Sequence, residues 1–213
     1  MENKVDNLLI IEHDNDTPTI LYYEENVVSD DDLNFLFDLN YKEGVYDKEE
    51  NKSVNKSLKV SRQQLWFQTE NKYFCPLWKK RLDRWEATPY SNQLFSIQNK
   101  IEELINNKLY LQFHSPIKIN SCLINYYESG SNFIPPHKDS SISFGEYPTI
   151  ICISHGDERT MRIKNEKESY DFNLKSNSIF IMAGSSQKYY THEILKNESV
   201  KPRYSLTFRN YIL

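Results

Sequence analysis

The C-terminal part of the chain, residues 119–213, consists of short runs of β-branched and aromatic residues separated by turn-forming residues. The separators contain Gly, Ser and Asn, as in residues 128–132 and 183–186. Seven or eight strands in fewer than 100 residues are typical of a β-sandwich or a β-barrel. This part of the chain is therefore expected to be all-β. The predicted strands cover residues 119–127, 148–154, 160–164, 170–174, 178–182, 189–194 and 203–211.

The N-terminal part of the chain carries two helical patterns. Ser29 precedes three aspartates and then leucines at helical spacing up to Leu39, which is typical of a short helix with acids at its positive end. Ser91 can cap a second helix over residues 91–108. One apolar stripe follows this second helix, so the helix is expected to lie against a sheet. The stripe consists of Leu94, Ile97, Ile101, Leu104 and Ile105.

Composition excludes several classes of protein. The five glycines form neither a dinucleotide-binding Gly-x-Gly-x-x-Gly string nor a P-loop, so nucleotide cofactors are not expected. The three cysteines, Cys75, Cys122 and Cys152, never occur as Cys-x-x-Cys, which argues against a disulfide framework and a thiolate zinc site. The sequence shows neither a signal peptide nor a run of 18 apolar residues. We therefore expect an intracellular, soluble protein with no membrane partner.

Charge is distributed unevenly along the chain. The formal net charge is −4, which does not favour binding of nucleic acid through the overall field. Residues 1–51 hold 3 basic and 15 acidic side chains, whereas residues 52–118 hold 12 basic and 5 acidic ones. Residues 119–213 are nearly balanced, with 11 basic and 10 acidic side chains. Solvated faces of different sign would explain this division, and it becomes informative only beside a functional site.

Two histidines and one aspartate form a candidate metal site. His137 and Asp139 are two residues apart, so an extended backbone places both side chains on one face. His192 lies on a predicted strand and completes a set of two imidazoles and one carboxylate. That set leaves metal positions open for ligands and is typical of non-haem Fe(II) oxygenases. The other three histidines occur in polar or turn segments and are not expected to be ligands; they are His13, His114 and His155.

The last predicted strand carries two arginines on one face. Arg203, Ser205, Thr207 and Arg209 alternate with Tyr204, Leu206 and Phe208. Solvated arginines on an edge strand would explain this pattern. A ligand with two carboxylates explains it as well, because planar guanidinium groups bind carboxylates through paired hydrogen bonds. 2-Oxoglutarate is such a ligand, since it can chelate iron at one end and pair with an arginine at the other.

These residues resemble the AlkB family of Fe(II)- and 2-oxoglutarate-dependent nucleic-acid dealkylases. The similar elements occur in the family's order, and the final Arg-x-x-Leu-Thr-Phe-Arg run is the most family-specific of them. They are Ser121–Tyr127, Gly130, His137–Asp139, residues 150–154, residues 179–184, Tyr190–His192 and Arg203–Arg209.

The resemblance implies a role for each matching residue. It implies that His137, Asp139 and His192 hold Fe(II). It also implies that 2-oxoglutarate is bound by Asn125, Tyr127, Arg203, Ser205 and Arg209. Two features depart from the family: Ser205 replaces an Asn that is common there, and Ser140 and Ser141 follow the His-x-Asp motif where an acidic residue is common.

Residues 60–67 resemble the segment of the family from which a lid over the substrate base extends. On this analogy Arg62, Trp66 and Tyr73 are candidates for contacting the nucleotide. For Trp66, packing in the core is an equally valid interpretation. The candidates for phosphate contacts are Lys72, Lys79, Lys80, Arg81 and Arg84.

The resemblance implies one oxygenase domain over residues 1–213, with a double-stranded β-helix (jelly-roll) core at 119–213. Residues 1–51 would be an acidic N-terminal part with helices, and residues 52–118 would form the nucleotide-recognition lid and a supporting helix. The expected reaction is oxidative demethylation of 1-methyladenine- or 3-methylcytosine-type bases in single-stranded DNA or RNA. It uses Fe(II), 2-oxoglutarate and O2 and releases formaldehyde, succinate and CO2.

Two alternatives to this function stay open. One is a hydroxylase or demethylase with the same cofactors that acts on a protein, a lipid or a small molecule. The other is a non-catalytic reader of modified nucleic acid. We expect a monomer.

Overall fold

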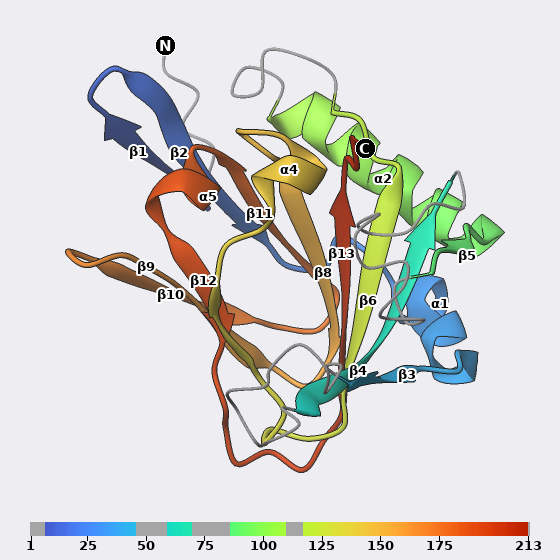
Figure 1. Cartoon of the computed structure of the whole chain (residues 1–213). Coiled ribbons are helices and arrows are strands. Elements are labelled where there is room, and N and C mark those ends of the chain that lie inside the picture. Colours follow the sequence, from blue (N-terminus) through green and yellow to red (C-terminus); the bar gives the residue numbers. More distant parts are fainter. Residues whose placement is uncertain (1–6, 46–58, 70–85, 110–116, 213) are drawn as a thin grey trace.

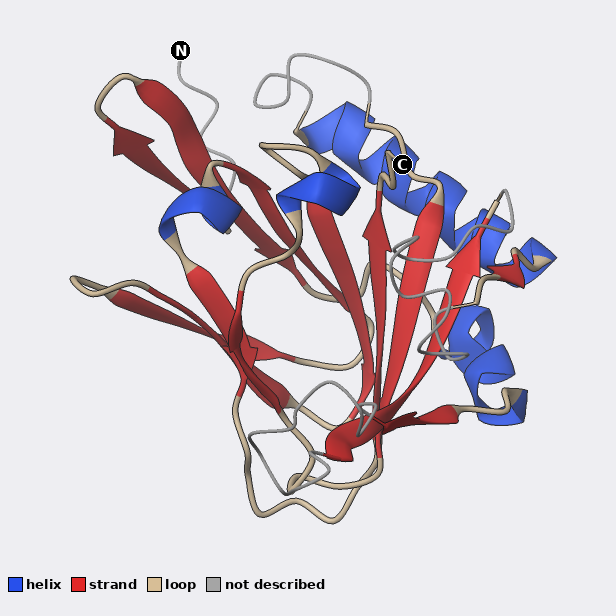
Figure 2. Ribbon diagram, in the orientation of Figure 1, coloured by secondary structure: helices blue, strands red, loops and turns tan. Residues whose placement is uncertain are grey.

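The computed structural model describes residues 7–45, 59–69, 86–109 and 117–212. The strands of these residues form a nine-stranded sheet and a four-stranded sheet (Figures 1 and 2). The order in the large sheet is β1-β2-β11-β8-β13-β6-β4-β3, with the short β5 beside β4. The order in the small sheet is β10-β9-β12-β7. Neighbouring strands are antiparallel except β4 and β5.

The strands of the large sheet come from both ends of the described chain. The acidic N-terminal residues supply β1 and β2, and β2 pairs directly with β11 from the C-terminal part. The bounds of these strands are β1 Leu8–His13, β2 Asp16–Glu24, β3 Lys42–Val45, β4 Lys59–Gln68, β5 Thr88–Pro89, β6 Ser121–Tyr127, β8 Ile150–Gly156, β11 Ser178–Gly184 and β13 Arg203–Arg209.

The small sheet and the helices complete the architecture. The strands of the small sheet are β7 Ile134–His137, β9 Arg159–Lys164, β10 Ser169–Leu174 and β12 Thr191–Ile194. The helices are α1 Asp30–Leu33, the 3-10 helix η1 Asn34–Asp38, α2 Asn92–Lys108, α4 Ser141–Phe144 and α5 Ser186–Tyr189. None of the helices in the described ranges is long and apolar enough to cross a membrane.

Helix α2 forms where the sequence predicts it and packs on the large sheet. The Ser91 side chain accepts a hydrogen bond from the Leu94 backbone N–H at 3.2 Å and so caps the first turn. The apolar stripe of α2 packs into the same core cluster as Ile124 and Leu206 of the large sheet. Figure 1 shows α2 on the face of the large sheet that points away from β9 and β10. The other face is therefore left for contact with the small sheet.

The predicted helix that begins after Ser29 is only partly α-helical. Ser29 and Asp32 form a reciprocal capping box, as the sequence favours. After Leu33 the chain continues as the 3-10 helix η1. Leu33 and Leu36 have no exposed surface, and a 3-10 helix places residues three apart on the same side. Burial of these two leucines explains the tighter winding.

All seven predicted C-terminal strands are present. The structure also contains β7, which the sequence pattern did not predict. Its sequence contains Pro135 and Pro136, which lower strand propensity because proline has no backbone N–H. β7 is an edge strand of the small sheet, where a missing donor is tolerated. The periodicity of the sequence therefore did not predict the strand that carries His137.

Replacement of Ile101 tests the packing of α2. Ile101 is 2% exposed in the core, so Ile101→Ala is expected to lower the free energy of unfolding by about 2–5 kcal/mol. Glu103→Ala on the exposed face of the same helix is expected to change it by about 0.5 kcal/mol or less. Urea denaturation measures both values, and similar losses would contradict the placement of Ile101 in the core.

Candidate metal centre and cosubstrate pocket

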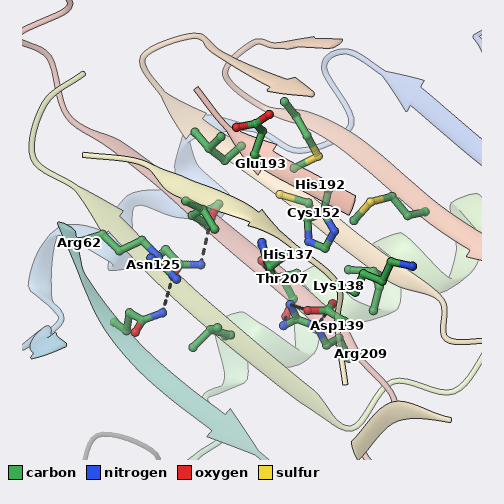
Figure 3. Close-up of a pocket in the computed structure, with 18 of the residues that line it drawn as sticks. Arg62, Asn125, His137, Lys138, Asp139, Cys152, His192, Glu193, Thr207 and Arg209 are labelled. Atoms are coloured by element: carbon green, nitrogen blue, oxygen red, sulfur yellow. Dashed lines mark hydrogen bonds and ion pairs between the residues drawn. The ribbon is translucent and has the colours of Figure 1, made fainter. Parts of the chain in front are cut away.

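A cavity of about 450 Å³ lies between the two sheets and contains the three predicted metal ligands (Figure 3). Its wall includes residues from the large-sheet strands β6, β8, β11 and β13 and from the small-sheet strands β9 and β12. Apolar side chains such as Leu123, Ile150, Met161 and Met182 make up much of this wall. Polar and charged side chains from both sheets line the rest of the cavity, among them the three predicted metal ligands.

The two sheets bring His137, Asp139 and His192 together. His137 ends β7 and lies directly opposite His192 of β12 in the antiparallel register. The two imidazole centroids are 4.1 Å apart, and Asp139 follows two residues after His137. One potential ligand atom from each of the three residues lies within 4.8 Å of the others. The predicted set of donors is thus assembled at one point.

Both imidazoles are neutral and able to bind a metal. Nδ1 of His137 lies 3.0 Å from the carbonyl oxygen of Pro135. Because a carbonyl only accepts, Nδ1 carries the proton and Nε2 keeps its lone pair. Burial lowers the pKa of His137. Burial and the neighbouring His137 lower the pKa of His192 to about 3, and His192 Nδ1 has no hydrogen-bond partner among the described residues.

Asp139 is held by a two-point ion pair with Arg209. Arg209 Nε donates to Asp139 Oδ2 at 2.8 Å, and Arg209 Nη2 donates to Oδ1 at 3.2 Å. Burial raises the pKa of Asp139, but the charge and hydrogen bonds of Arg209 together with the two neighbouring histidines outweigh burial, and the pKa falls to about 2. The carboxylate therefore stays ionised and oriented. The resemblance gives Arg209 a role toward 2-oxoglutarate. This role stays a prediction, because the hydrogen bonds of Arg209 go to Asp139 and to the backbone carbonyl of Thr207.

Arg203 provides a buried cation for a carboxylate ligand. Its side chain lines the cavity, the residue is 1% exposed, and Nη2 donates to Ser154 Oγ at 2.7 Å. The guanidinium carbon lies 5.0 Å from the centroid of the Tyr127 ring. Within the described residues, Arg203 Nε and Nη1 and the Tyr127 hydroxyl lack hydrogen-bond partners. Buried charges are normally paired, so this group fits a carboxylate of a bound ligand.

Asn125 is fixed by neighbours on β4 and β13. Its Oδ1 accepts hydrogen bonds from Arg62 Nε at 2.9 Å and from Gln64 Nε2 at 2.8 Å, and its Nδ2 donates to Ser205 Oγ at 3.4 Å. Sequence reasoning missed Gln64 and Ser154. Strand alternation could have indicated Gln64, because Arg62 and Gln64 share one face of β4.

These groups fit Fe(II) and 2-oxoglutarate. Two neutral imidazoles and one ionised carboxylate match a metal that keeps positions open for other ligands. A chelating dicarboxylate would find Arg203 and Tyr127 as partners for a carboxylate in the same cavity.

Residues 27–209 match the family model described as the 2OG-Fe(II) oxygenase superfamily. The chain belongs to this superfamily. This oxygenase is 27% identical over 128 residues to the alpha-ketoglutarate-dependent dioxygenase alkB homolog 3 of Mus musculus, covering 54% of the chain and 41% of that protein. It is 25% identical over 118 residues to the DNA oxidative demethylase ALKBH2 of Arabidopsis thaliana, covering 43% of the chain and 38% of that protein.

The alignments thus span about two fifths of the length of these curated relatives. They confirm the predicted resemblance to the AlkB family, and the protein is a dioxygenase that uses Fe(II), 2-oxoglutarate and O2. The solved structure of OsALKBH1 has a TM-score of 0.61 and 15% sequence identity over 89% of this chain and 97% of that chain. This likeness concerns the fold alone and, with the two facing sheets, confirms the jelly-roll core.

The structure places the residues that were expected to contact the nucleotide in different surroundings. Arg62 lines the cavity, so its role stays a prediction. Trp66 has no exposed surface and packs with Leu123 and Phe144 in a core cluster. Its expected base contact is therefore wrong, because an enclosed indole cannot stack on a base, and the core interpretation holds. Tyr73 and the predicted phosphate contacts lie outside the described residues; the latter are Lys72, Lys79, Lys80, Arg81 and Arg84.

The three remaining histidines were expected in polar or turn segments. His13 Nε2 lies 2.9 Å from Thr19 Oγ1 on the neighbouring strand. His155 differs from the expectation, because it is a strand residue with only 7% of its surface exposed. Neither residue belongs to the described metal group. His114 lies outside the described residues.

Arg203→Met tests the carboxylate site. The variant removes the unpaired cation but keeps a side chain of apolar bulk, so 2-oxoglutarate is expected to bind roughly tenfold weaker or worse. Calorimetric titration of the Co(II)-loaded protein measures this affinity without turnover. Arg162→Met is the matched control, because Arg162 pairs with Asp171 at an exposed site outside the cavity. Unchanged affinity in the Arg203 variant would remove Arg203 from the cosubstrate site.

Arg209→Met tests the ion pair. Without the guanidinium, the strongest influence that lowers the pKa of Asp139 is lost, so burial raises this pKa. Because a metal ligand must be deprotonated, Co(II) affinity is expected to fall, and to decline at a higher pH than in the wild type. Titrations between about pH 5 and pH 8 measure this profile. A profile that matches that of Arg162→Met would contradict the orienting role of Arg209.

Proposed function

We propose that this oxygenase removes N-alkyl groups oxidatively from bases of the 1-methyladenine and 3-methylcytosine type in single-stranded DNA or RNA. The observation that carries the proposal is that the three metal ligands line a largely apolar cavity between the two sheets, with His192 buried and with His137 and Asp139 only partly exposed. A base inside a duplex cannot reach such a centre, so the substrate base must be unpaired or flipped out. The similarity to the DNA oxidative demethylase ALKBH2 of Arabidopsis thaliana supports the choice of substrate.

In this reaction the side chains of the protein would bind the metal and the cosubstrate and exclude water. When bound, iron supplies the oxidising chemistry with 2-oxoglutarate and O2, and the hydroxylated N-alkyl group leaves as formaldehyde. His137, Asp139 and His192 would hold the metal, and Arg203 with Tyr127 would hold a carboxylate of 2-oxoglutarate. The apolar side chains of the cavity would exclude water from the reacting centre.

The rim of the cavity supplies the parts that would meet the substrate. Ile142 of α4 is 72% exposed and lines the cavity together with Lys138 and Arg62. An exposed aliphatic side chain and two cations in the lining of one cavity suit a nucleotide, whose base is flat and whose phosphate is anionic. An assay on several methylated bases tests which base a cavity lined by Ser140 prefers.

The deciding experiment is a mass-spectrometric assay on single-stranded DNA and RNA oligonucleotides that carry several methylated bases. We expect loss of the methyl group with release of formaldehyde, and no loss when iron or 2-oxoglutarate is omitted. A parallel incubation with unmodified protein extract tests the alternative substrates. Succinate formation with the extract, without demethylation of any oligonucleotide, would contradict the proposal in favour of a protein, lipid or small-molecule substrate.

Asp139→Ala is expected to abolish turnover and most iron binding, because it removes the only anionic ligand of the metal group in the described chain. Metal analysis and the oligonucleotide assay measure the two effects. Asp171→Ala, at the exposed pair with Arg162, is the control and should leave both unchanged. Activity with stoichiometric iron in Asp139→Ala would remove Asp139 from the ligands, and affinity for oligonucleotides without any turnover in the wild type would favour a non-catalytic reader.

A further inference from the structure

The short helix α5 lies between β11 and β12 in the chain and leads directly into the strand that carries His192. It also forms hydrogen bonds to the segment that carries His137 and Asp139. The Gln187 side chain on α5 accepts a hydrogen bond at 2.8 Å through Oε1 from the backbone N–H of Asp139. Lys138 Nζ donates a second bond to the backbone carbonyl of Lys188. The His-x-Asp segment is therefore joined to the segment that leads into His192.

The amide of Gln187 is oriented for this bond. The residue is 7% exposed, so water does not readily replace its partners. Its Nε2 lies 3.5 Å from Ser186 Oγ and 3.7 Å from Met182 Sδ, both of which can accept. The backbone N–H of Asp139 can only donate. Oε1 is thus the atom that must face Asp139, and the reversed amide would lose this hydrogen bond.

The helix that carries Gln187 is itself anchored to the N-terminal hairpin. The backbone N–H of Ser185 donates to the Pro18 carbonyl at 3.2 Å, and Ser185 Oγ donates to the Thr17 carbonyl at 2.5 Å. α5 is therefore a fixed support from which Gln187 reaches the metal segment.

Asp139 is consequently held at two different points. Arg209 holds its carboxylate, and Gln187 holds its backbone. A carboxylate held only by Arg209 could still move with its backbone, because Asp139 lies in the connection between β7 and α4 and not within a strand. Groups that fix a metal ligand in this way commonly change metal affinity by about 10–100-fold when they are removed.

We propose that Gln187 is a positioning residue of the metal centre, which sets the place of Asp139 through its backbone N–H and couples it to the segment of His192. The role concerns assembly of the metal site and is independent of the substrate. Failure of the demethylation assay would therefore leave it standing, and its own failure would leave the proposed substrate class untouched.

The test is a titration of the full chain with Co(II), followed by the visible absorption of the metal, without nucleic acid and without turnover. Gln187→Met keeps a similar length but removes the amide oxygen, so Co(II) is expected to bind about tenfold weaker or worse, with an altered spectrum. Gln187→Glu keeps an acceptor at the same place, so it is expected to restore most of the affinity and the wild-type spectrum.

Tyr189→Phe is the matched control on the same helix. It removes the hydrogen bond from α5 to Asp16 but leaves the contact between Gln187 and Asp139, so Co(II) affinity is expected to stay at the wild-type level. Thermal unfolding without metal measures the stability of each variant. Three results would overturn the proposal: unchanged binding by Gln187→Met, equal loss in Gln187→Glu and Gln187→Met, or equal loss in Tyr189→Phe. If Gln187→Met does not fold, the Glu and Phe variants still decide.

Discussion

The alternation of side chains along β13 is the constraint on which the rest of the structure depends. β13 is hydrogen-bonded to β6 and β8 on its two sides and is buried along its whole length. One face gives Leu206 and Phe208 to the core beneath α2, and the other gives Arg203 and Arg209 to the cavity. A shift of one residue would exchange these faces and place two cations in the apolar core. The register that stabilises the fold is therefore the register that builds the site.

The sequence predicted those features that follow from local periodicity. The apolar runs predicted the C-terminal strands, and the spacing of His137 and Asp139 predicted a shared face that His192 then joins. Features that depend on tertiary neighbours were not predicted. Nothing local distinguishes Trp66 as a core residue from Trp66 as a base contact, because both require an apolar side chain at that position. The ion pair of Arg209 with Asp139 could not be predicted either, because the two residues are 70 positions apart in the sequence and only the fold brings them together.

The acidic N-terminal residues have a structural use that their net charge does not suggest. Glu24 pairs with Lys108 of α2, and Asp16 accepts hydrogen bonds from Tyr147 and Tyr189 at the side of the molecule where α5 lies. These carboxylates therefore join segments that are far apart in the sequence. Exposed ion pairs of this kind contribute little energy individually. Their value here lies in connecting β2 to α2, to α5 and to the segment that follows α4.

The two prolines of β7 have a consequence for how the protein meets other chains. β7 forms one open edge of the small sheet, and exposed edges can recruit a strand from another molecule. Because the N–H groups of consecutive strand residues point to opposite sides, one of Pro135 and Pro136 lacks a donor toward β12 and the other lacks a donor that a recruited strand would need. The edge beside His137 is thereby less suited to sheet extension and aggregation.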